Sequence, residues 1–85
     1  VLQYNLGTFL HQLGRPQEAA PCFEQVVRTV PDFAAYHVLL GHALGQAGLT
    51  DQAARQFREA IKRDPRCKPA REGLVWADAR RKPGR

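Results

Sequence analysis

The sequence predicts an all-α protein in which helical hairpins stack into a solenoid. The first observation is a period of 34 residues, at which Leu6, Gly7, Leu10, Gln12, Gly14, Ala19, Ala20, Phe23 and Pro31 return as Leu40, Gly41, Leu44, Gln46, Gly48, Ala53, Ala54, Phe57 and Pro65. The second observation is that apolar residues within each copy follow the 3.6-residue period of an α-helix. A fixed period of this length with helical patterning indicates stacked repeats.

The first hairpin is expected over residues 1–33. One face of its first helix carries three leucines, Leu6, Leu10 and Leu13. Gly14 is suited to end that helix, and Pro16 fits the first turn of the next. Pro21 should distort the second helix slightly without breaking it. Pro31 ends it, because a proline pushes the preceding residue out of the helical conformation.

The second hairpin, expected over residues 34–67, repeats this plan. Gly48 ends its first helix, Thr50 is the candidate N-cap of its second, and Pro65 closes the hairpin.

Gly7 and Gly41 occupy equivalent places inside the first helix of each copy. Glycine inside a helix costs up to about 1 kcal/mol relative to alanine. Its recurrence therefore indicates that a facing helix approaches closely, and the expected neighbours are the alanine pairs at 19–20 and 53–54.

Residues 68–81 are expected to form one further helix that caps the solenoid. Leu74 continues the repeat, whereas Val75 replaces its glycine. Polar residues such as Asp78 give this helix the water-tolerant outer face that a solenoid end requires. The tail at 82–85 is expected to be disordered.

This pattern resembles the tetratricopeptide repeat, a 34-residue helix–turn–helix unit with the signature W-x2-L-G-x2-Y…A-x3-F…P. Both copies match the Leu, Gly, Ala, Phe and Pro places. They depart at the two aromatic places, where Gln3 and His37 replace the Trp, and Leu10 and Leu44 replace the Tyr. The resemblance covers residues 1 to about 66. It implies a right-handed helical solenoid that works in protein–protein interaction or scaffolding.

In this family the helix face opposite the core leucines lines a concave groove that binds extended peptides or a partner helix. The resemblance therefore implies a groove lined by Tyr4, Thr8, His11, Val38, His42, Gly45, Glu72 and Trp76. Aromatic anchors in a concave surface are typical binding hot spots. Such a groove would prefer apolar or aromatic side chains of a protein or peptide partner, with Lys68, Arg71 and Arg80 favouring acidic flanks.

A first alternative function is self-association into a homo-oligomer. The apolar strip of Leu2, Asn5 and Phe9 corresponds to Tyr36, Leu39 and Ala43, which should pack on the preceding helix pair. The sequence contains no methionine and is interpreted as a piece of a longer chain. The strip is therefore expected to meet an upstream repeat in that chain, or a second copy of this one.

A second alternative is contact with an anionic ligand or nucleic acid through the basic C-terminal end. Residues 62–85 hold nine basic and three acidic residues, whereas residues 1–61 hold four basic and five acidic ones. The basic patch of Lys68, Arg71, Arg80 and Arg81 can contact phosphates. Nucleic-acid binding is nevertheless disfavoured, because Trp76 is the one aromatic residue among these basic residues and no nucleic-acid motif is present.

Catalysis, cofactors and metals are not expected. The chain has no serine nucleophile, and His11, His37 and His42 lack the spacing of metal ligands. No apolar run approaches the ~20 residues of a membrane span. Cys22 and Cys67 lie far apart and outside any CxxC motif, so free thiols in a reducing, cytoplasmic compartment are expected.

Overall fold

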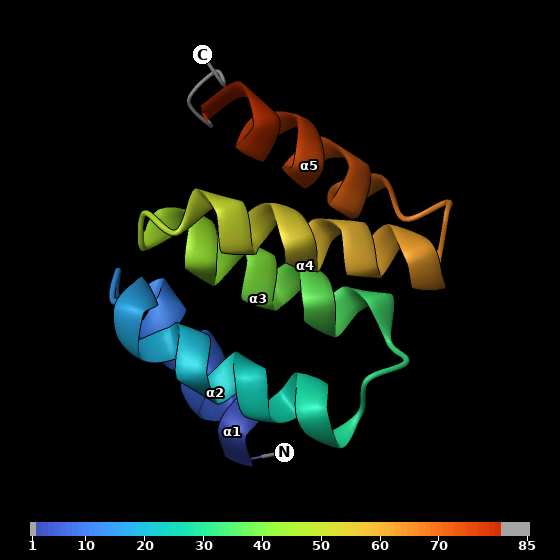
Figure 1. Ribbon diagram of the computed structural model, residues 1–85. Helices are drawn as coiled ribbons and strands as arrows, with labels where there is room; N and C mark the ends of the chain where they lie inside the picture. The colour runs from blue at the N-terminus through green and yellow to red at the C-terminus, as the bar shows by residue number, and fades with distance from the viewer. Residues whose placement is uncertain (1, 81–85) are drawn as a thin grey trace.

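Five α-helices follow one another in the computed structural model, which describes residues 2–80 (Figure 1). They are α1 (Leu2–Gln12), α2 (Pro16–Thr29), α3 (Ala34–Gln46), α4 (Thr50–Arg63) and α5 (Lys68–Arg80). No strand occurs within residues 2–80. The predicted all-α, helical-hairpin solenoid is therefore confirmed. Arg81 and the predicted tail at 82–85 lie outside the described residues.

The helices form three layers along the long axis of the molecule (Figure 1). α1 pairs with α2, α3 pairs with α4, and α5 lies on the far side of the second pair. α2 packs on α3 and α4 packs on α5, so each layer rests on the next. α3 also packs directly on α5, whereas α1 and α3 have little direct packing.

Helix ends follow the sequence in most places. Gly14 and Gly48 adopt φ angles of +77° and +89°, a left-handed conformation that glycine reaches without strain. Pro21 is accommodated inside α2, which continues unbroken from Pro16 to Thr29. The expected N-cap role of Thr50 is wrong, because Thr50 is already helical and Leu49 holds the cap position without a side-chain hydrogen bond.

Two fully buried phenylalanine rings, Phe23 and Phe57, fill the space that the helical glycines leave. A Cβ atom on Gly41 would lie 2.8 Å from the Phe57 ring, and one on Gly73 would come closer still. Gly7 meets Phe23 in the same way, at 2.8 Å. Close approach at the helical glycines is thus present, but the neighbours are these rings and not the alanine pairs.

The outer face of α1 is more exposed than its leucine pattern predicts. Leu6 and Leu13 were expected in the core but are 42% and 53% exposed, and Leu10 alone of the three packs against it. The equivalent Leu40 is buried, because α2 covers that side of α3. With Leu2 (75% exposed) and Phe9 (57%), the two leucines form a stripe at i, i+4, i+7 and i+11, which we call the α1 stripe.

His37 occupies the tryptophan position of the repeat, and its hydrogen bonds stabilise the junction between the two hairpins. It is buried, its Nε2 lies 2.8 Å from the Pro31 carbonyl oxygen, and its Nδ1 lies 2.9 Å from Gln56 Oε1. The Arg63 guanidinium also donates to the Pro31 carbonyl oxygen. A second hydrogen bond from Arg63 lowers the pKa of Glu59.

Candidate interaction groove

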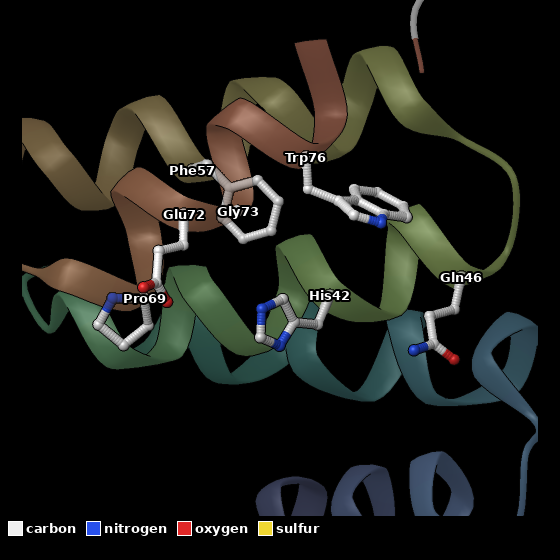
Figure 2. A pocket seen from close by; sticks show the side chains of 7 residues that line it. All are labelled: His42, Gln46, Phe57, Pro69, Glu72, Gly73 and Trp76. Atoms are coloured by element: carbon white, nitrogen blue, oxygen red, sulfur yellow. The ribbon is translucent and has the colours of Figure 1, made fainter. Parts of the chain in front are cut away.

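A pocket of about 310 Å³ opens between α3 and α5, with α4 behind it (Figure 2). α3 contributes His42 and Gln46, and α4 contributes the Phe57 ring. The remaining lining comes from α5, through Pro69, Glu72, Gly73 and Trp76. The pocket is therefore made by three helices, and its walls are mainly aromatic with a carboxylate and an amide at the rim (Figure 2).

Trp76 forms one wall of the pocket because Gly45 leaves room for its indole. A Cβ atom on Gly45 would lie 2.6 Å from the indole Cζ3, so any larger residue there would displace the ring. The Arg80 guanidinium lies 4.3 Å from the centroid of the Trp76 ring, within the range of a cation–π contact. Trp76 remains half-buried, so part of the indole is available to a ligand.

His42 sits in the centre of the groove and meets Phe57 edge to face, with 5.5 Å between the ring centroids. Burial lowers the pKa of His42, and the neighbouring charge of His11 lowers it further. His11 Nδ1 is buried and has no hydrogen-bond partner within the described part of the chain. A neutral imidazole at residue 42 keeps this part of the groove free of charge near neutral pH.

The structure brings some of the predicted groove residues together around one pocket and places others elsewhere. His42, Glu72 and Trp76 line one pocket, and His11 lies near enough to His42 to affect its titration. Gly45 lies beneath the Trp76 ring. Val38 is buried in the core, so it supports the groove from below and offers no contact surface.

The two remaining groove residues do not join this pocket. Tyr4 packs beside Tyr36, with 5.8 Å between the ring centroids, in a separate recess. The Thr8 hydroxyl donates to the Tyr4 carbonyl oxygen at 2.9 Å, which occupies it within its own helix.

Four pocket residues were missed by the sequence analysis of the groove: Gln46, Phe57, Pro69 and Gly73. Gly73 left a detectable signal, since it stands 34 residues after Leu39, at a place that faces the preceding helix pair. A glycine there makes room for the Phe57 ring.

The surfaces of the two alternative functions are also defined. Asn5 is exposed together with the apolar residues of the α1 stripe. Of the basic patch, Lys68 and Arg71 are exposed on α5, where Lys68 lies 4.0 Å from Glu72. Arg80 covers Trp76 as described. Lys68 and Arg80 thus interact with neighbouring side chains, Glu72 and Trp76.

A sequence model of the tetratricopeptide repeat matches residues 10–75, from α1 into α5. This chain belongs to the tetratricopeptide repeat family. Tetratricopeptide repeats generally mediate protein–protein interaction and are typically non-catalytic scaffolds. The tetratricopeptide repeat match therefore supports a protein-interaction role for this chain.

This tetratricopeptide repeat chain is also similar to a curated protein of Mus musculus, protein arginine N-methyltransferase 9. The two are 35% identical over 65 residues, which cover 76% of this chain and 8% of that protein. The similarity thus concerns a small part of the relative's length.

Further properties of the tetratricopeptide repeat structure bear on its chemistry. Cys22, which is buried, and Cys67, which is half-buried, are both free thiols. Residues 2–80 contain no cluster of three or more side chains suited to hold a metal ion. None of the helices in this range has the length and apolar character needed to span a bilayer.

Proposed function

We propose that this tetratricopeptide repeat chain binds an extended peptide or a helix of a partner protein along the groove formed by α3 and α5. The partner inserts an apolar or aromatic side chain into the pocket beside Trp76. The chain has no catalytic activity of its own in this proposal, and it acts in the cytoplasm.

The observation that carries the proposal is the aromatic pocket itself. The indole of Trp76 and the imidazole of His42 border one space of about 310 Å³, and the fully buried ring of Phe57 lies beneath them. That volume is at the low end of ligand pockets, which are roughly 300–1,000 Å³. It suits one inserted side chain better than a cofactor, and aromatic residues of this kind are the usual anchors of protein interfaces.

The charges around the pocket favour a partner whose anchor has acidic neighbours. Lys68 and Arg71 are exposed on α5 in a neighbouring recess that shares Glu72 with this pocket, and Arg80 lies over the Trp76 ring. Glu72 partly offsets them at the rim, where it lies 4.0 Å from Lys68. Exposed charges of this kind affect association rate and partner selection more than affinity.

A peptide-library selection against the intact chain tests this function. We expect selected peptides to share an apolar or aromatic anchor and to bind Trp76→Ala at least tenfold more weakly. A Glu24→Ala variant, changed at an exposed residue of α2, is the control and should bind like the wild type. Peptides that bind Trp76→Ala with unchanged affinity would contradict the groove.

Self-association is a second candidate function, supported by the α1 stripe. Three large apolar side chains on one face of the 11-residue α1, continued by Leu13 just after the helix, expose an unusual amount of apolar surface for a monomer. Light scattering over a concentration series should show a dimer that Phe9→Glu abolishes. Val75→Glu, at a 70% exposed residue of α5, is the matched control and should leave the dimer intact. A monomer at every concentration would contradict this candidate.

A further inference from the structure

A second recess, of about 270 Å³, lies between α1, α2 and the start of α3. Its walls are formed by Gln3, Tyr4, Gln25, Val26, Thr29, Val30 and Tyr36. The Tyr4 and Tyr36 rings are tilted by 56° to each other with 5.8 Å between their centroids, and the Phe33 ring, next to the recess, lies 5.5 Å from Tyr36. We call this space the tyrosine recess.

The fold does not require this recess, as the second hairpin shows. Four of the seven lining residues, Gln3, Tyr4, Val26 and Tyr36, have buried equivalents 34 positions later, which are His37, Val38, Ala60 and Ala70. The equivalents of the other three, Glu59, Arg63 and Asp64, lie toward the outside and are not buried. In that part of the molecule α3 packs directly on α5, whereas α1 and α3 have little direct packing. In the second hairpin, packed side chains thus fill the position that is equivalent to the recess. In the first hairpin, which has Tyr4 and Tyr36 there, the position stays open.

The lining of the tyrosine recess carries no charge. Acidic and basic residues make up 25% of the chain, yet the seven lining residues include none. The Thr29 hydroxyl donates to the Gln25 carbonyl oxygen at 2.9 Å, so it is satisfied within its own helix. The donors available to a ligand are the side-chain amides of Gln3 and Gln25 and the hydroxyls of the tyrosines. An uncharged ligand that presents hydrogen-bond acceptors complements this surface.

Rows of tilted aromatic rings with neighbouring amide or hydroxyl donors are the surfaces that dock proline-rich segments. A polyproline II helix has no internal hydrogen bonds, so its carbonyl oxygens are free to accept from such donors. It is also ordered before binding, which reduces the entropy cost of association. Its pyrrolidine rings are apolar and can pack between aromatic rings.

We propose that the tyrosine recess is a second binding site, which takes an uncharged, proline-rich segment of a partner in the polyproline II conformation. Tyr4 and Tyr36 grip the proline rings, and Gln25 donates to a backbone carbonyl of the segment. The site is separate from the pocket beside Trp76 and does not depend on the function proposed for it.

The test uses an acetylated and amidated proline decamer as the probe and amide NMR shifts of the intact chain as the readout. We expect saturable shifts centred on residues 3–4, 25–30 and 33–36. Tyr4→Ala should weaken binding at least tenfold. Leu49→Ala, which shortens an exposed apolar side chain outside the recess, is the control and should bind like the wild type. Trp76→Ala should also bind like the wild type, and raising the salt concentration should change the affinity less than twofold.

Several results would overturn the proposal. These are the absence of saturable shifts, equal binding of a glycine–serine decamer, and a loss in Leu49→Ala as large as that in Tyr4→Ala. If Tyr4→Ala loses its helical circular dichroism, Tyr4→Phe and Gln25→Ala take its place, because both change exposed side chains and keep the packing. Each should weaken binding about threefold, and unchanged affinity in both would equally overturn the site.

Discussion

The indole of Trp76 on α5 lies directly against the backbone of Gly45 on α3. A Cβ atom at residue 45 would come within 2.6 Å of the indole Cζ3 and 2.9 Å of its Cη2. The position of the Trp76 ring in the pocket wall therefore depends on the lack of a side chain at residue 45. The glycine on α3 and the tryptophan on α5 fit together at this contact.

Gly45→Ala should move Trp76 while leaving the fold stable. Alanine is favoured over glycine inside a helix by about 1 kcal/mol, and the half-buried indole can rotate toward solvent to avoid the new methyl group. We expect the free energy of unfolding to change by less than about 1 kcal/mol. The fluorescence emission of Trp76, the one tryptophan of the chain, should shift to longer wavelength. Glu24→Ala, at an exposed residue of α2, is the control. An unshifted spectrum in Gly45→Ala would contradict the contact.

Gly41→Ala should be much more damaging, although it is the same substitution in the same helix. Its methyl group would lie 2.8 Å from the Phe57 ring, which is fully buried and is also closely approached by Gly73 of α5. Overpacking of a closed core costs about 1–3 kcal/mol. Urea unfolding should show a loss of this size. Equal stability of Gly41→Ala and the wild type would show that the Phe57 ring has room to move.

His37→Ala should destabilise the junction between the hairpins. It removes two hydrogen bonds of a buried side chain, to the Pro31 carbonyl and to Gln56, at a net cost of about 0.5–1.5 kcal/mol each. Thermal or urea unfolding measures the loss. His11→Ala is the matched control, because His11 Nδ1 has no hydrogen-bond partner in the described residues. A control that loses as much stability as His37→Ala would contradict this role.

Stability should fall as the pH falls below the ordinary histidine pKa of 6.5, in part because of His42. Burial and the charge of His11 lower the pKa of His42 in the folded chain, so the unfolded chain binds the proton more strongly. The unfolded state therefore gains stability relative to the folded state as pH decreases from 6.5 toward the folded pKa. Urea unfolding at pH 7.5 and pH 5.5 should show a smaller loss in His42→Gln than in the wild type. If both proteins lose the same stability between pH 7.5 and pH 5.5, His42 does not contribute to the pH dependence.

The internal repeat explains how far the sequence predicts the fold. Equivalent residues share their environment when both hairpins have the same neighbours, so Phe23 and Phe57 are buried alike and Gly14 and Gly48 end their helices alike. Leu6 breaks the correspondence with Leu40, because α2 covers α3 whereas no described helix covers the stripe of α1. Periodicity assigns a residue to a face, and only the neighbouring helix decides whether that face is buried.

The groove was less predictable than the fold for a related reason. The helix period placed Tyr4, His42 and Trp76 in one line, but α1 and α3 are not packed as α3 and α5 are. Tyr4 therefore meets Tyr36 in a recess of its own. Gln46 and Pro69 were not predicted, because the pocket takes residues from both α3 and α5. The periodic pattern of one helix does not show which residues of two helices face each other.

The hydrogen bonds of the Pro31 carbonyl limit where this chain can accept insertions and deletions. Its oxygen is hydrogen-bonded to His37, six residues later, and to Arg63 in the last turn of α4. An inserted or deleted residue in the short connector before α3 would pull this carbonyl out of register with both side chains at once. The connector should therefore resist insertions and deletions, and the 34-residue spacing is fixed at this point by side-chain chemistry as well as by helix length.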